Sequence, residues 1–251
     1  MSRTILLLLS AVFVLSGCRV AQSITQVQPQ KNIRIEAHLP EDAAVANTIA
    51  PYKKSLEDQM KAKISHTAVD LNKQGDNSNL GNLLADFTLQ GANAWSMQNN
   101  RPAVDAAVIN SGGIRSTIGV GDIFLRHIYE VMPFENELVI VKMKGSDVQY
   151  LFDYYLETQK NNPVSGLKIE TKNGKLQTQT INGKILDPAK TYYIATSDFL
   201  ALGGDNMKFF GRGEMISTGI KLRDLYVQKF REMPEVTAPA DIRLQFHKNN
   251  K

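Results

Sequence analysis

The stretch Glu137-Leu-Val-Ile-Val-Lys-Met-Lys144 leads directly into Gly145 and Ser146, where the hydrophobic period of the chain changes. Up to Lys144 the residues are apolar or alternate in polarity, as in a strand. Beyond it, apolar residues recur every three or four positions, as on one face of a helix that Ser146 can cap. They are Val148, Leu151, Phe152 and Tyr155. The junction therefore predicts a strand followed at once by an amphipathic helix.

Similar segments lie on both sides of this junction. Strands are expected at 103–110, 167–171, 176–181, 184–186 and 191–196. Asn182-Gly183, which separates two of them, is typical of a type I′ hairpin turn. Helices are expected where apolar residues recur at 45–60, 80–95 and 222–230, with Pro51 either inside the first helix or at its start. Hairpins mixed with helices predict one α+β domain with a mixed β-sheet and flanking helices.

The N-terminal residues carry a different pattern. Cys18, the single cysteine, follows a basic start and an apolar run at 5–15 that is too short to span a bilayer. Leu15-Ser-Gly-Cys18 resembles the lipobox of bacterial lipoproteins, in which the cysteine is lipidated; an ordinary signal peptide followed by an unmodified cysteine is the alternative. We expect a signal peptide at 1–17, a lipidated Cys18 with a flexible tether at 18–32, a folded domain at 33–235 and a frayed polar tail at 236–251.

The lipobox resemblance also predicts where the protein resides. Several acyl chains on Cys18 would make a stable membrane anchor, because a single chain holds only marginally. We therefore expect an exported lipoprotein of the bacterial cell envelope. Arg19, which stands where an aspartate would mark retention in the inner membrane, favours the outer membrane.

The composition is that of an ordinary folded domain. Of the 251 residues, 43% are hydrophobic and 22% are charged, which excludes a disordered or fibrous chain. The net charge is +4, from 29 basic and 25 acidic side chains, and no block of basic residues occurs. We therefore expect no nucleic-acid partner.

The sequence contains no recognisable catalytic motif. Its four histidines are isolated and do not form the ligand pairs that a two-metal hydrolase requires; they are His38, His66, His127 and His247. Neither a Gly-x-Ser-x-Gly elbow nor a Walker loop occurs. We therefore predict no catalytic residue, no metal ligand and no cofactor in this chain.

Four short signatures follow one another in a fixed order. They are Asn79-Leu-Gly-Asn-Leu-Leu-Ala-Asp86, Asn110-Ser-Gly-Gly-Ile-Arg115, Pro133-Phe-Glu-Asn136 and Ser197-Asp-Phe-Leu-Ala-Leu-Gly-Gly-Asp205. Each alone has a plain structural explanation, such as a helix cap or a glycine turn. In the second, two glycines can present backbone N–H groups beside a guanidinium.

Together, in this order and spacing, the signatures resemble the C-terminal domain of the 5′-nucleotidase and UDP-sugar hydrolase family. The resemblance runs from about residue 41 to residue 233, which is nearly the whole predicted domain. It implies the fold of that C-terminal domain, which recognises the substrate in the family. It also implies a partner, a metallophosphatase domain that holds the divalent metals and hydrolyses the phosphate ester.

The resemblance implies roles for five residues. Phe134 and Phe199 match the two aromatic rings that sandwich the nucleobase. Asp205 matches the carboxylate that accepts hydrogen bonds from the ribose hydroxyls. Asn110 matches an amide beside the base, and Arg115 matches the arginine that reaches the ribose and phosphate. Aromatic rings suit a base, a carboxylate suits a diol, and a guanidinium suits a phosphate.

One position departs from the family pattern. Members often carry a further arginine a few residues before the first signature, where this chain has Gln74-Gly-Asp-Asn-Ser78. The loss of that arginine would weaken contact with phosphate and ribose. It would shift the preference towards nucleosides or uncharged groups.

Three hypotheses about function follow from the resemblance. The favoured one is the recognition subunit of a split 5′-nucleotidase, which works with a separate metallophosphatase, because 251 residues have room only for the recognition half. Such a chain is not expected to be active alone. The second is a tethered nucleotide or nucleoside receptor without hydrolytic function. The third is a structural or interaction lipoprotein that has lost the site; the intact set of five residues counts against it.

Overall fold

The computed structural model describes Pro29, Asn32 and residues 41–247. The predicted signal peptide, Cys18 and the tether apart from Pro29 and Asn32 lie outside these residues. The chain divides into two units, residues 1–48 and 49–251. Helix α2 (Ala43–Met60) runs across that division and contains Pro51, so the first of the two alternatives for this proline is confirmed. In the part of the chain that is described, no helix combines the length and the apolar character of a membrane span.

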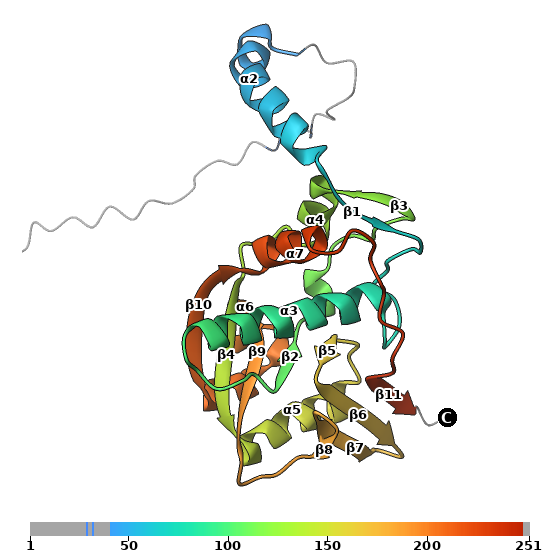
Figure 1. The fold of residues 1–251 in the computed structure, drawn as a ribbon, viewed down its shortest axis with the longest axis vertical. Helices are drawn as coiled ribbons and strands as arrows, with labels where there is room; N and C mark the ends of the chain where they lie inside the picture. Colours follow the sequence, from blue (N-terminus) through green and yellow to red (C-terminus); the bar gives the residue numbers. More distant parts are fainter. Residues whose placement is uncertain (1–28, 30–31, 33–40, 248–251) are drawn as a thin grey trace, which may run out of the picture. The chain divides into compact units, whose positions relative to one another are not determined.

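Residues 61–247 form eleven strands, with helices and 3₁₀ turns between them (Figure 1). The strands are β1 (Lys63–Thr67), β2 (Ala106–Val108), β3 (Gly121–Phe124), β4 (Glu137–Lys144), β5 (Val164–Ser165), β6 (Leu167–Lys172), β7 (Lys175–Ile181), β8 (Lys184–Ile185), β9 (Thr191–Ser197), β10 (Glu214–Lys221) and β11 (Leu244–His247). The helices are α3 (Asn79–Gln98), α4 (Leu125–Val131), α5 (Gly145–Thr158), α6 (Asp198–Ala201) and α7 (Leu222–Arg231), and the 3₁₀ turns are η1 (Ser111–Gly113), η2 (Gly204–Asn206) and η3 (Lys208–Arg212).

A five-stranded mixed sheet lies at the centre, in the order β10-β4-β9-β2-β5. Strands β2 and β9 are parallel, whereas β4 is antiparallel to both of its neighbours. A second sheet, β11-β6-β7-β8, is also mixed, because β11 runs parallel to β6. Strands β1 and β3 form a small third sheet. The predicted α+β domain with a mixed sheet and flanking helices is confirmed.

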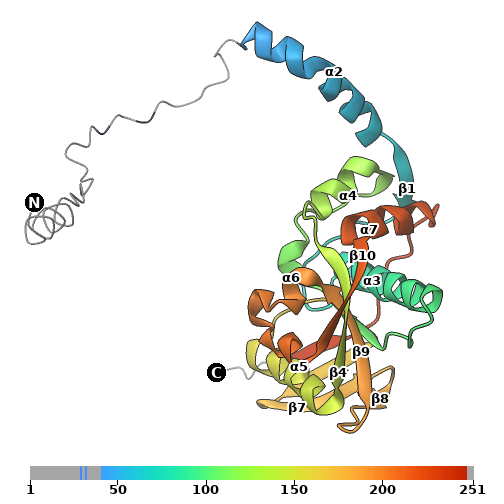
Figure 2. The ribbon, with the colours of Figure 1, turned by 90° about the vertical axis from the view of Figure 1, so that its left-hand side faces the viewer.

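The side chains of β4 explain why helices cover both faces of the central sheet. Leu138 and Ile140 join the core that contains the buried residues of α3 and α7. Val139 and Val141, one position along, join the core under α5. Because successive strand residues point to opposite faces, one strand supports two cores. Figure 2 shows α3 on one side of the sheet and α5 on the other.

The prediction of the β7–β8 turn and the prediction of the cap of α5 have different outcomes. The hairpin between β7 and β8 turns at Asn182 and Gly183, which both have positive φ (50° and 73°), as a type I′ turn requires. By contrast, Ser146 does not cap α5. The helix starts at Gly145, after the N-cap residue Lys144. A side chain at Gly145 would collide with the backbone carbonyl of Asp187, so only glycine fits at the first position of the helix.

The prediction of a frayed tail from residue 236 is wrong for the residues up to 247. Val236 is buried, and β11 pairs with β6 over four residues at the edge of the second sheet (Figure 1). Leu244 in this strand is only 1% exposed. The folded domain therefore extends past residue 235.

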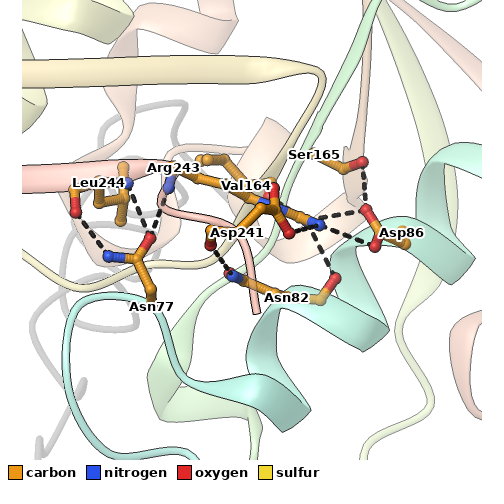
Figure 3. A network of polar contacts seen from close by, with 8 residues as sticks. All are labelled: Asn77, Asn82, Asp86, Val164, Ser165, Asp241, Arg243 and Leu244. Atoms are coloured by element: carbon orange, nitrogen blue, oxygen red, sulfur yellow. Dashed lines mark hydrogen bonds and ion pairs between the residues drawn. The ribbon is translucent and has the colours of Figure 1, made fainter. Parts of the chain in front are cut away.

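Arg243 holds this last segment in place (Figure 3). Its guanidinium donates to both carboxylate oxygens of Asp86 at 2.8 and 2.9 Å, and to both oxygens of Asp241 at 2.8 and 3.0 Å. It also donates to two backbone carbonyls, those of Asn82 and Val164. Burial by itself lowers the pKa of Arg243, but the hydrogen bonds to the two carboxylates outweigh it and raise the pKa. The buried cation is thus fully paired, as burial of a charge requires.

Candidate functional site

Three connections meet at one edge of the central sheet. Strands β2 and β9 are parallel, so both end at this edge. Strand β4 is antiparallel to β9, with Leu138 opposite Ser197, so it begins there. The second, third and fourth signatures occupy these connections: they follow β2, precede β4 and follow β9. The topology therefore brings together residues that are up to 95 positions apart (Asn110 and Asp205).

A cavity of about 300 Å³ lies between these connections. Its lining residues are Asn110, Gly112, Gly113, Arg115, Phe134, Asn136, Phe199 and Asp205. All five residues that the sequence singled out are among them. Asn136 was not singled out, although it lies in the third signature two positions after Phe134, and that spacing was the signal that could have found it.

The two phenylalanine rings come from different connections. Phe134 precedes β4 and Phe199 lies in α6, and they remain 42% and 44% exposed. Large aromatic side chains contribute most to stability when they are buried. Two half-exposed rings that line one cavity therefore provide apolar surface that is available to a flat ligand.

The loop after α6 fixes the position of Asp205. A side chain at Gly204 would lie 2.5 Å from ring atoms of Phe199 and 2.6 Å from its carbonyl oxygen, so only glycine fits here. Asp205 itself adopts a left-handed conformation with φ 50° and ψ 26°. This conformation is uncommon for a residue with a side chain. The loop thus places a carboxylate beside the Phe199 ring.

The loop after β2 brings Arg115 to the cavity. Gly113 fits closely against the side chain of Asn110, because a Cβ at Gly113 would lie 2.8 Å from Asn110 Oδ1. The backbone N–H of Arg115 donates to the Val131 carbonyl at 2.8 Å, and its Nη1 donates to the Gly112 carbonyl at 3.2 Å. Within residues 41–247 the guanidinium has no other hydrogen-bond partner, so its remaining donors suit an anionic or hydroxyl-bearing ligand.

The first signature has a structural role. Asn79 Oδ1 accepts from the backbone N–H groups of Asn72 and Leu80, both at 2.8 Å. Asp86, at its end, pairs with Arg243. Gln74, in the departing segment, is exposed and does not line the cavity. The neighbouring Lys73 donates from Nζ to the carbonyl of Ile114 at 2.5 Å, one residue before Arg115.

The described histidines have partners elsewhere in the fold. His66 lies 3.1 Å from a carboxylate oxygen of Glu235, and His247 lies 3.3 Å from one of Glu170. His127 Nδ1 accepts from the backbone N–H of Phe124, and burial lowers its pKa. Among residues 41–247, no group of three His, Cys, Asp or Glu side chains is arranged to hold a metal ion.

Fold and cavity together define an α+β domain with a cavity at one edge of its central sheet, lined in part by two phenylalanines. The family described as 5′-nucleotidase, C-terminal domain, matches residues 58–212. The chain belongs to this family.

Relatives and solved structures agree with this assignment. The chain is 30% identical over 207 residues to the protein UshA of Escherichia coli strain K12, covering 76% of this chain and 35% of that protein. It is 29% identical over 228 residues to a 5′-nucleotidase of Vibrio vulnificus, covering 84% and 38% respectively. The structure of a 5′-nucleotidase precursor from Thermus thermophilus superposes with a TM-score of 0.68 at 26% identity, over 84% of this chain and 44% of that one. The chain thus spans less than half the length of these proteins.

Proposed function

We propose that this domain recognises the nucleoside part of a nucleotide in the cavity between Phe134 and Phe199. The observation that carries the proposal is that both half-exposed rings line one cavity together with Asp205 and Arg115. Every nucleobase has a π face on which an aromatic ring can stack. A carboxylate suits the two hydroxyls of a ribose, and a guanidinium suits a phosphate. Asn110 and Asn136 would offer amide groups to the base edge.

We further propose that hydrolysis of the phosphate ester requires a metallophosphatase that acts with this domain. The matched family is a C-terminal domain, and the matched relatives named 5′-nucleotidase are longer proteins. Divalent metals on the metallophosphatase would supply the chemistry. The residues of this domain would bind and orient the nucleoside. Lipidation at Cys18 would hold the protein at the bacterial cell envelope.

The free energies involved favour weak binding by the domain alone. Stacking of a base on an aromatic ring contributes about 1–3 kcal/mol. A hydrogen bond to a charged group contributes about 1.5–3 kcal/mol. Two rings and one carboxylate therefore contribute roughly 4–9 kcal/mol before any ordering cost, whereas a micromolar complex needs about 8 kcal/mol after ordering costs are met. We expect dissociation constants closer to millimolar than to nanomolar.

Calorimetric titration of the purified chain tests the recognition function. Adenosine and AMP are expected to bind, whereas ribose 5-phosphate, which has no base to stack, is expected to bind more weakly. Because this chain has Gln74-Gly-Asp-Asn-Ser78 where family members often carry a further arginine, AMP is expected to bind only slightly more tightly than adenosine. Absence of binding by every nucleoside and nucleotide at about 10 mM, well above the expected dissociation constants, would contradict the proposal.

A hydrolysis assay tests the proposed division of labour. The purified chain, supplied with Mg²⁺, Mn²⁺ or Zn²⁺, is expected to release no phosphate from AMP. Release of phosphate by the chain alone would contradict the requirement for a metallophosphatase. Phosphate release measured after addition of a two-metal phosphatase domain from a relative would support it.

Gly204→Ala is expected to reduce nucleoside affinity by about tenfold or more, because one stacking contact is worth about 1–3 kcal/mol. The added methyl would overlap the ring and the carbonyl of Phe199, so the ring must move. Gly211→Ala is the matched control, since nothing lies within 4 Å of its Cβ position. Titration of both variants with adenosine makes the comparison; equal affinities would contradict the packing argument.

A further inference from the structure

Asn162 lies between α5 and β5 and is only 2% exposed. It does not line the cavity. Its Oδ1 accepts from the backbone N–H of Ser111 at 3.0 Å and lies 3.3 Å from the Ser111 hydroxyl. Only the oxygen of the amide can accept from a backbone N–H, so this contact fixes the orientation of the side chain. Asn162 is therefore bonded to the loop that carries Asn110 and Arg115.

The other half of the amide leads to Asp205, in a second loop that lines the cavity. Asn162 Nδ2 donates to the hydroxyl of Tyr154 at 3.1 Å. The Tyr154 hydroxyl in turn donates to the backbone carbonyl of Asp205 at 3.2 Å. Burial raises the pKa of Tyr154, so the hydroxyl keeps the proton that it donates. The chain of hydrogen bonds thus runs from Ser111 through Asn162 and Tyr154 to Asp205.

The middle of this chain is firmly supported. The Tyr155 hydroxyl donates to the backbone carbonyl of Asn162 at 2.9 Å, and Tyr155 is fully buried. The ring of Tyr154 packs edge-on against Tyr155 and tilted against Phe209, with centroids 5.6 and 5.7 Å apart. The next residue, Pro163, accepts from the backbone N–H of Ile109 at the end of β2. Buried polar groups with this many partners rigidify their surroundings.

Asp205 and its neighbour Asn206 both need such support, because both have positive φ (50° and 65°). The left-handed conformation of Asp205 costs free energy and persists only where surrounding contacts hold it. The hydrogen bond from Tyr154 is made to the carbonyl of this residue. We propose that Asn162 is a positioning residue that, through Tyr154, fixes the Asp205 carboxylate relative to the Asn110–Arg115 loop. The consequence for affinity rests on the proposed function; the coupling of the two loops does not.

Tyr154→Phe is the sharpest variant, because it removes one hydroxyl and keeps the packed ring. We expect the affinity for adenosine to fall about tenfold, as the loss of one well-placed hydrogen bond to a charged group would give. The affinity for 2′,3′-dideoxyadenosine, which has no diol for Asp205, is expected to stay unchanged. Asn162→Ala is expected to weaken adenosine binding at least as much and to weaken the dideoxy analogue to a smaller extent, because it also releases Ser111 in the loop that carries Asn110. The double variant is expected to show no larger a loss than Asn162→Ala alone. Asn161→Ala is the matched control, since that half-buried amide donates to the backbone carbonyl of Gly75 instead.

Hydrogen exchange in the ligand-free protein tests the coupling without reference to any ligand. Asn162→Ala is expected to accelerate exchange at the Ser111 amide and in residues 203–206 by tenfold or more, and Tyr154→Phe only in residues 203–206. Unchanged exchange in both loops would overturn the proposal. So would equal losses of affinity for adenosine and its dideoxy analogue in Tyr154→Phe, which would indicate general loosening. If exchange changes as expected and the wild type binds no nucleoside, the coupling stands and the proposed function fails.

Discussion

Arg243→Met is expected to lower the free energy of unfolding by about 3–5 kcal/mol, the usual cost of removing one partner of a buried ion pair. Arg243 is 8% exposed and makes hydrogen bonds to Asp86, Asp241 and two backbone carbonyls. Without it, the Asp86 carboxylate is left with Ser165 as its remaining described partner, at 2.6 Å. The segment that contains β11 also loses its ion pair with α3, and the bond from the Asn82 amide to the Asp241 carbonyl at 3.4 Å remains.

Thermal and urea unfolding measure this effect. The midpoint of thermal unfolding is expected to fall by roughly 6–20 °C, given about 2–4 °C per kcal/mol for a domain of this size. Arg231→Met, at an exposed position in the last turn of α7, is the matched control and is expected to change stability by about 0.5 kcal/mol or less. Equal stability of the two variants would show that the C-terminal segment is not held by this network.

Phe134→Ala and Phe199→Ala are each expected to weaken nucleoside binding by about 5- to 150-fold, because each removes a stacking surface worth about 1–3 kcal/mol. Both rings are more than 40% exposed, so the cost in folding stability is expected to be small. Loss of affinity without loss of stability is the signature of a binding surface. Phe→Leu at each position keeps apolar area but removes the π face, and is expected to recover only part of the affinity.

Competition titrations with adenosine and uridine measure these losses. The purine is expected to lose more than the pyrimidine, since its larger ring system covers more of each phenylalanine. Phe246→Ala is a matched control: this half-buried ring in β11 packs against the core under α5 and does not line the cavity. A loss of affinity in the control as large as in the ring variants would contradict a specific stacking site.

Much of the fold could be predicted because its signals are local. The strand at 137–144 and the Asn182-Gly183 turn are encoded within a few residues, and the structure has both. The cavity residues could be predicted for another reason, since their signatures resemble those of a known family. Taken from the residues alone, each signature has a plain structural explanation: a helix cap, a glycine turn, a phenylalanine in the core and a Gly-Gly-Asp loop. Physical reasoning from the sequence could not bring them to one sheet edge without the strand order.

The C-terminal segment could not be predicted, because its contacts are distant in sequence. Arg243 is 157 positions from its partner Asp86, and a polar stretch that ends in charged residues is typical of a frayed terminus. The same holds for Asn162, whose partner Ser111 is 51 positions away. No periodicity marks a buried polar side chain of this kind. Only the tertiary structure shows that the amide connects two walls of a cavity.

We propose that a nucleobase lies between Phe134 and Phe199. The most direct test is a nuclear Overhauser measurement on adenosine in exchange with the full chain, deuterated except at its ten phenylalanine rings. We predict Overhauser contacts from the base protons H2 and H8 to ring protons that disappear in Phe134→Leu and Phe199→Leu separately. Contacts that persist in both variants, or a saturable complex that shows no contact to any phenylalanine ring, would contradict the claim.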